Sequence, residues 1–148
     1  MPSRDDSVLF QCGSIRLPRA ALRKFADELQ QRVARGRQFG CLITRDAELQ
    51  RLNREFLEND YPTDVLSFPS GSRDGVLGEI AISVDRAKEQ AAEFGHTTDE
   101  EIRILMLHGV LHLLGMDHER DRGRMRREEA RWRHELGLRA GLIERTRA

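Results

Sequence analysis

The sequence predicts a single α+β domain in which a small mixed sheet of four strands packs against about five helices. Its 148 residues suit one domain with an apolar core and are short for two, so we expect residues 1–148 to form one unit. Short apolar runs typical of strands alternate with longer segments whose apolar residues recur at helical spacing, and turn-forming residues separate them. Hydrophobic residues make up 39% of the chain and charged residues 34%, which is the composition of a soluble globular protein.

Four apolar runs are predicted to be strands. Val8–Cys12 alternates weakly, as an edge strand does, and Phe39–Thr44 is a short apolar run. Val65–Phe68 and Val76–Val84 flank a turn-forming segment that is rich in Ser and Gly. We therefore expect the last two strands to pair as a hairpin.

Three helices are predicted outside the most informative part of the chain. The first begins at Pro18, which is tolerated at the first helical position, and ends near Gly36. The second is capped by Asp46 and carries apolar residues on one side. The third is capped by Asp85 and ends at about Phe94.

The fourth helix is predicted to be the buried centre of the domain. Two threonines followed by glutamates three residues later are capping-box candidates and place its start near Thr97. Residues 104–114 are apolar nearly all round, and Gly115 is placed to end the helix after about Leu114. A highly charged fifth helix follows His118.

Charge and cysteine usage narrow the class of protein. The 25 basic side chains balance the 25 acidic ones, although residues 119–148 hold ten Arg against six acidic residues. That stretch is either a solvated helical face or a phosphate-contacting surface. Cys12 and Cys41 lie in apolar stretches, as reduced core thiols of a cytosolic protein do. The charged start is unlike a signal peptide and no apolar run is long enough to cross a membrane, so we expect a cytoplasmic protein with no membrane contact.

The strongest chemical signal is the segment HGVLHLLGMDH at residues 108–118. His108 and His112 are four residues apart on the predicted helix, so their imidazoles lie on one face at a separation that one zinc ion can bridge. Gly115 can take a left-handed conformation and turn the chain, which would bring His118 to the same ion. We therefore predict one Zn²⁺ ion bound by these three histidines.

Three ligands leave a coordination position for water, whose pKa zinc lowers to about 7, and this points to hydrolysis. Asp117 is expected to accept a hydrogen bond from a ligand histidine, although it could also reach the ion. Cys41 is expected in the core rather than as a fourth ligand. His96 and His134 have no other histidine at metal-ligand spacing and are expected at the surface.

The histidine spacing is also that of the metzincin peptidases, which carry Glu after the first His as general base. This chain has Gly109 there, which disfavours proteolysis. Gly in a helix interior costs about 1 kcal/mol relative to Ala. We therefore expect a compensating close contact of the sheet or of a substrate backbone with the helix.

Two further segments accompany the histidine motif: LNREF with DYPTDVLSFP within residues 52–69, and LGEIAIS at residues 77–83. On these three segments the chain resembles the YbeY family of bacterial endoribonucleases and ribosomal RNA maturation factors, over about residues 40–120. The resemblance implies a single-domain α+β fold with zinc at the three histidines in a cleft. It further implies cleavage of single-stranded RNA, 16S rRNA 3′-end maturation and quality control of the small ribosomal subunit. The RNA and proteins of that subunit would then be the partners of this chain. We expect the chain to be a monomer.

The chain departs from the family at two positions. Family members carry Arg where this chain has Leu57, and Leu cannot replace the charge of a phosphate clamp. Arg54, one helical turn earlier, is the nearest alternative source of that charge. Family members also carry Asp where this chain has Glu79, a milder change. The first departure weakens the prediction of nuclease activity more than that of zinc binding.

The leading hypothesis is metal-assisted cleavage of an RNA phosphodiester, with Asp117, Asp64 and Glu79 as candidate general bases. Two alternatives stay open. One is a ribosome-assembly factor that binds RNA and protein, has a structural zinc and cleaves little. The other is a metallopeptidase-like hydrolase.

Overall fold

Four strands form one mixed sheet in the order β1-β2-β4-β3 in the computed structural model, which describes residues 7–57, 63–71, 75–116 and 122–138. The strands are Val8–Gln11 (β1), Gln38–Thr44 (β2), Val65–Pro69 (β3) and Val76–Ser83 (β4). β1 and β4 both run parallel to β2, whereas β3 is antiparallel to β4. The expected hairpin and the edge position of the first strand are confirmed, and each strand differs from its predicted bounds by one residue.

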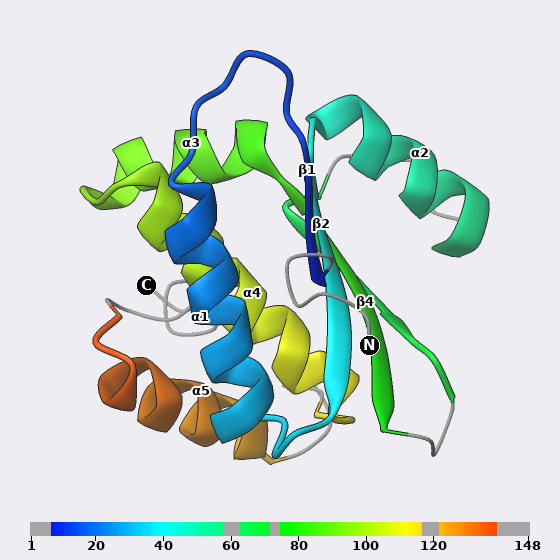
Figure 1. Cartoon of the computed structure of the whole chain (residues 1–148), viewed down its shortest axis with the longest axis vertical. Helices are drawn as coiled ribbons and strands as arrows, with labels where there is room; N and C mark the ends of the chain where they lie inside the picture. The colour runs from blue at the N-terminus through cyan, green and yellow to red at the C-terminus, as the bar shows by residue number, and fades with distance from the viewer. Residues whose placement is uncertain (1–6, 58–62, 72–74, 117–121, 139–148) are drawn as a thin grey trace.

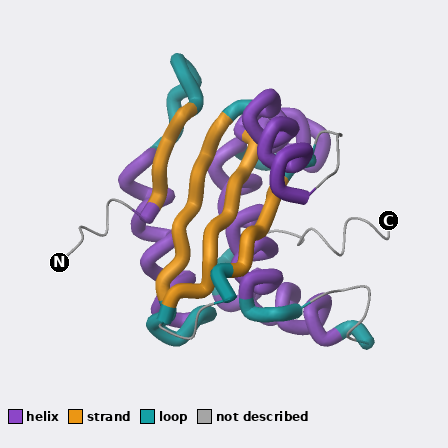
Figure 2. Tube along the Cα trace, turned by 90° about the vertical axis from the view of Figure 1, so that its right-hand side faces the viewer, coloured by secondary structure: helices purple, strands orange, loops and turns teal. Residues whose placement is uncertain are grey.

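Five helices accompany the sheet in the described part of the chain. They are Arg19–Arg32 (α1), Asp46–Leu57 (α2), Val84–Phe94 (α3), Thr98–Leu113 (α4) and Arg124–Glu135 (α5). α1, α3, α4 and α5 lie on one side of the sheet and α2 lies on the other (Figure 1). Figure 2 looks onto the face that carries α2, with the four strands in front of the other helices. The α+β class and the mixed four-stranded sheet predicted from the sequence are confirmed.

The two faces of the sheet are separated by the alternation of side chains along each strand. On β4, Ile80 and Ile82 belong to the main core cluster, which also contains the buried residues of α4. Ala81 points the other way and packs with Leu49 of α2 in a second, smaller cluster. α4 is therefore buried against one face, while α2 covers part of the other.

α4 is the buried central helix that the sequence predicted. Most of its residues from Glu101 to Val110 are buried, because helices and the sheet surround it. Thr97 caps its start by accepting a hydrogen bond from the backbone N–H of Glu100 at 3.3 Å. Its last turn is followed by Gly115, whose φ of +93° is the left-handed conformation that favours glycine. None of the described helices is both long and apolar enough to cross a membrane.

The start of α3 differs from the prediction, which assigned its cap to Asp85. α3 begins directly after β4, so the capping residue is Ser83, whose hydroxyl accepts from the N–H of Arg86 at 3.2 Å. Asp85 lies in the first turn and reaches across to the start of α2. There it accepts from the N–H of Asp46 at 2.7 Å and from Nε of Arg45 at 3.0 Å.

The carboxylate of Asp85 therefore stabilises a helix other than its own. Its hydrogen bond from the Arg45 guanidinium, together with the backbone hydrogen bond from Asp46, holds the pKa of the Asp85 carboxyl below its usual range. The Arg45 side chain is 52% exposed, so the ion pair itself adds little stability. The capping hydrogen bond to α2 is the larger contribution.

We expect Asp85→Ala to lower the free energy of unfolding by about 1 kcal/mol at neutral pH, because α2 loses its capping acceptor. Since the pKa of Asp85 is lower in the folded than in the unfolded protein, its contribution is complete above the unfolded value of about 4 and is lost as the pH falls through the folded value. Urea unfolding of both proteins at a series of pH values checks this. A difference that stayed constant down to acid pH would contradict it.

Candidate metal centre

The position of α4 is set by a close approach to β4 at Gly109. A Cβ atom at Gly109 would lie 2.9 Å from Cγ2 of Ile80, closer than side-chain carbons pack. On the neighbouring strand, the hydroxyl of Ser67 donates to the carbonyl oxygen of Gly109 at 3.2 Å. Of the two compensating contacts expected for this glycine, the one with the sheet is confirmed. The same contact brings the turn of α4 that carries His108 close to the sheet.

His108 and His112 lie side by side on α4, as their spacing predicts. Their ring centroids are 4.8 Å apart, with an angle of 75° between the ring planes. His108 is buried, at 6% exposure, whereas His112 is half-buried. Two imidazoles in such proximity on a rigid helix are a donor set that suits zinc.

A carboxylate that the sequence analysis missed contacts the first of these histidines. Oε2 of Glu129 on α5 lies 2.7 Å from Nδ1 of His108, and both side chains are buried. The charge of residues 119–148 predicts only a solvated or phosphate-contacting face for α5. A signal was available, because Glu129 follows the apolar Met125 by four residues and both must share one face of the helix.

The third predicted ligand, His118, lies outside the described residues, and so does Asp117. Within the residues that the structure does describe, no group of three His, Cys, Asp or Glu side chains could hold a metal ion. The two predicted ligands that are described fit zinc, because they offer paired imidazoles of which one is already hydrogen-bonded to a carboxylate. The three-histidine site stays a prediction.

A cavity of about 360 Å³ adjoins His112. It lies between the end of α2 and β3, and among the described residues it is lined by Asn53, Leu57, Thr63, Val65, Leu66, Ser67, Pro69 and His112. No side chain in this set other than His112 can carry a charge. Leu57 therefore lies close to the predicted metal centre, and Arg54 is not part of the described lining.

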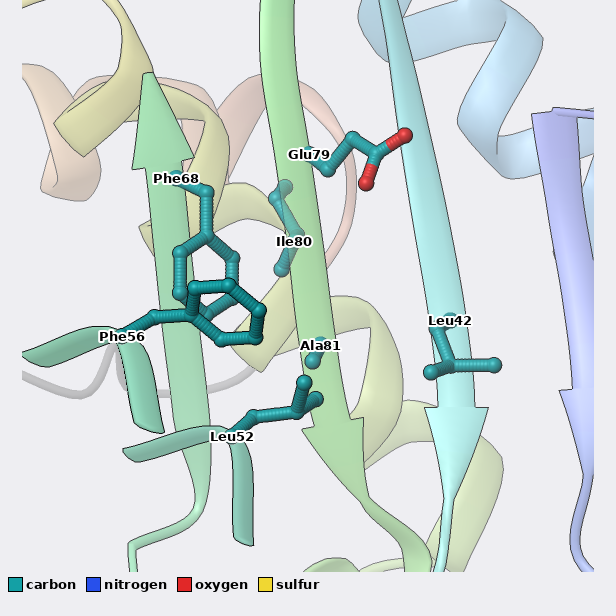
Figure 3. Close-up of a pocket in the computed structure, with 7 residues that line it drawn as sticks. All are labelled: Leu42, Leu52, Phe56, Phe68, Glu79, Ile80 and Ala81. Carbon is teal, nitrogen blue, oxygen red and sulfur yellow. The ribbon is translucent and has the colours of Figure 1, made fainter. Parts of the chain in front are cut away.

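Glu79 lies on the opposite face of the sheet from the histidine pair. Because Ile80 faces α4 and successive side chains of a strand point to opposite faces, Glu79 lies on the α2 side of the sheet. Figure 3 shows its side chain extending from β4 toward β2. It borders an apolar cavity of about 370 Å³ whose lining includes Leu52, Phe56 and Phe68.

Asp64 is engaged at the start of β3. Its carboxylate accepts a hydrogen bond from Nε2 of Gln90 on α3 at 3.1 Å. Its carbonyl oxygen accepts from the N–H of Ser83 at 2.9 Å. The first contact joins the start of β3 to α3 and the second joins it to the end of β4, so Asp64 has a structural role.

Two expectations about other residues have clear outcomes. The side chain of His96 is only 2% exposed, so its assignment to the surface was wrong, whereas His134 is exposed as expected. His96 is buried because its Nε2 lies 2.5 Å from Oε1 of the buried Glu101. Cys41 is in the core, as expected, and burial raises the pKa of its thiol to about 12.

Comparison with known proteins identifies the family. A family model described as Endoribonuclease YbeY matches residues 13–137. The chain belongs to the endoribonuclease YbeY family. A protein named endoribonuclease YbeY from Solibacter usitatus is 60% identical over 142 residues, which cover 96% of this chain and 95% of that protein.

Other YbeY-family relatives and a solved structure agree with this assignment. A protein named endoribonuclease YbeY from Koribacter versatilis is 56% identical over 109 residues, which cover 74% of this chain and 71% of that protein. The solution structure of a Thermotoga maritima protein is similar in fold, with a TM-score of 0.57 and 26% identity over 84% of this chain and 85% of that one. The resemblance drawn from the histidine, PTDVLSF and LGEIAIS segments is therefore confirmed.

We expect Gly109→Ala to destabilise the protein, because its methyl group would overlap Ile80. Overpacking of this kind costs about 1–3 kcal/mol, which outweighs the gain of about 1 kcal/mol from the better helix propensity of Ala. The control is Gly40→Ala on β2, where a Cβ atom would meet only the side chain of Glu79 at 3.6 Å. Denaturant unfolding compares the variants, and a Gly109→Ala protein as stable as the wild type would contradict the packing argument.

Proposed function

We propose that this chain is a zinc-dependent endoribonuclease that cleaves single-stranded RNA in the cytoplasm. Its role would be 16S rRNA 3′-end maturation and quality control of the small ribosomal subunit, with that subunit's RNA and proteins as partners. Membership of the YbeY family supports RNA cleavage. The observation that carries the metal chemistry is the pair of imidazoles, with centroids 4.8 Å apart, on the buried helix α4.

The residues proposed to hold the ion are His108, His112 and His118. Bound zinc supplies Lewis acidity toward a phosphoryl oxygen and lowers the pKa of water, which is the chemistry that phosphodiester hydrolysis needs. His108 and His112 would hold the ion close to the sheet, because the close contact of Gly109 with Ile80 packs α4 tightly against β4.

The cavity beside His112 is the proposed binding place for the RNA next to the cleaved bond. Its described walls are apolar at Leu57, Val65 and Pro69 and carry the hydroxyls of Thr63 and Ser67. Such a lining suits the base and sugar of a nucleotide better than its phosphate, because it offers no cationic side chain. Of the candidate general bases, Glu79 lies on the other face of the sheet and Asp64 is hydrogen-bonded to Gln90, whereas Asp117 lies outside the described residues and stays a candidate.

One observation favours a second candidate function, a ribosome-assembly factor with a structural zinc and little nuclease activity. Leu57 lines the cavity beside His112, at the position where the family carries Arg, so the transition-state charge lacks that clamp. Zinc removal distinguishes the two functions. Unfolding on chelation, together with no RNA cleavage by any metal-loaded sample, would favour the assembly factor.

The metallopeptidase alternative has less support. A peptidase of the metzincin type needs Glu directly after its first histidine. This chain has Gly109 there, and Ile80 leaves no room for a side chain at that position.

We expect His112→Ala to abolish cleavage of a single-stranded RNA by the purified protein and to reduce its zinc content, because two-point coordination from α4 is lost. His134→Ala is the control, since that histidine is exposed on α5 and distant in sequence from the pair. Cleavage is followed on a gel and zinc by elemental analysis. Equal cleavage by wild type and His112→Ala would mean that the activity is independent of the proposed site.

We expect Leu57→Arg to raise the cleavage rate, because a guanidinium at this wall of the cavity can face the phosphate of the bound RNA. Leu57→Gln is the matched control, since it is polar and carries no charge. Single-turnover cleavage at several salt concentrations measures the effect. If the Arg and Gln variants cleaved at the wild-type rate, position 57 would be no clamp.

A further inference from the structure

Glu129 is a buried carboxylate on an otherwise charged and largely solvated helix. Its side chain is 1% exposed, and Met125, one turn earlier on the same face of α5, is fully buried. Burial of a carboxylate is costly unless hydrogen bonds or opposite charge compensate for it. A residue that merely filled space between α5 and α4 would be apolar, as Met125 is.

The contact that Glu129 makes constrains the imidazole of His108. A carboxylate has acceptor sites only, so at 2.7 Å from Nδ1 it receives a hydrogen bond from that ring nitrogen. In a neutral imidazole one nitrogen carries the hydrogen and the other carries the lone pair. With the hydrogen on Nδ1, the lone pair of His108 is on Nε2.

We infer that Glu129 is a positioning residue for the metal centre: it fixes the tautomer and the orientation of His108 so that Nε2 is the ligand atom. The inference rests on the proposed zinc site and does not depend on RNA cleavage. A carboxylate behind a metal-binding imidazole also raises the basicity of that ligand, and the loss of such a partner typically weakens metal affinity 10–100-fold. Glu129 touches neither the substrate nor the reacting atoms in this account.

This role requires that α5 itself be held in place, and contacts with α1 do so. The guanidinium of Arg32 lies 5.7 Å from the centre of the Trp132 ring. The same guanidinium approaches the carboxylate of Glu135 at 3.5 Å. Arg32 and Glu135 are half-exposed and add little, so the burial of Met125 in the core cluster that contains α4 is what mainly holds Glu129 against α4.

The chain contains a second buried His–Glu pair that serves as a natural control. Glu101 lies seven residues before His108 on α4, which is about 10 Å along the helix axis. Its carboxylate contacts Nε2 of His96, and both side chains are buried. The two pairs share their chemistry and their burial, but only the pair of Glu129 includes a predicted ligand.

The experiment compares the zinc affinity of four full-length proteins by competition with a chromophoric chelator, with thermal unfolding of each as a second measurement. They are the wild type, Glu129→Ala, Glu129→Gln and Glu101→Ala. We expect Glu129→Ala to bind zinc roughly 10–100-fold more weakly. Glu129→Gln, which keeps an acceptor beside Nδ1, is expected to lose less. Glu101→Ala is expected to lose stability while its zinc affinity stays that of the wild type.

A spectroscopic measurement reads the tautomer directly and needs no variant of Glu129. Ring ¹⁵N shifts of His108 in the zinc-free wild type, at a pH where the imidazole is neutral, are expected to show hydrogen on Nδ1. The signal is assigned by its absence from His108→Gln. Hydrogen on Nε2 would overturn the inference, even if the Glu129 variants failed to fold.

The outcomes separate this inference from the proposed function. Equal zinc affinity in the wild type and Glu129→Ala, or equal weakening in Glu129→Ala and Glu101→Ala, would overturn the positioning role and leave the zinc site intact. No zinc binding by the wild type would overturn the zinc site and this role with it. Weaker binding confined to the Glu129 variants supports both.

Discussion

The van der Waals contact between Gly109 and Ile80 determines where everything else in the candidate site lies. It brings the axis of α4 closer to the sheet than any other residue at position 109 would permit, because a Cβ atom there would lie 2.9 Å from Cγ2 of Ile80. His108 precedes this contact on α4, and its buried ring meets Glu129 of α5. A helix that packed at an ordinary distance would leave the same histidine further from the sheet and from the hydroxyl of Ser67, which hydrogen-bonds the same turn.

The sequence predicted most of the fold because local signals and the global arrangement agree. Strand bounds follow from apolar runs that end at turn formers, and Gly115 ends the buried helix because its positive φ excludes most other residues. The histidine pair was predictable for the same reason, since the four-residue spacing is a property of one helix. Asp85 was assigned wrongly because a cap is defined by where the helix begins, and β4 continues into α3 without a loop.

Contacts between segments that are distant in the sequence could not be predicted from it. Glu129 and His108 are separated by 21 positions and meet only because α5 packs against α4, and no spacing rule connects two helices. Glu79 is the opposite case: its carboxylate made it a candidate general base, but the geometry of the sheet places it away from the histidines. The pleat of β4 assigns Ile80 to α4 and therefore Glu79 to the other face.

The hydrogen bond from Asp46 to Asp85 has a mechanical consequence for the cavity beside His112. It joins the first residue of α2 to the first turn of α3, and Leu57 is the last of the 12 residues of α2, roughly 16 Å away along its axis. The far half of α2 is held by contacts of its own, because Asn53 is buried and the ring of Phe56 lies edge-on to that of Phe68 on β3, with centroids 6.1 Å apart. The wall at Leu57 therefore follows a helix that is fixed at its start by a capping hydrogen bond and near its end by an aromatic pair. The shape of this opening thus depends in part on a carboxylate at the opposite end of the helix that does not line it.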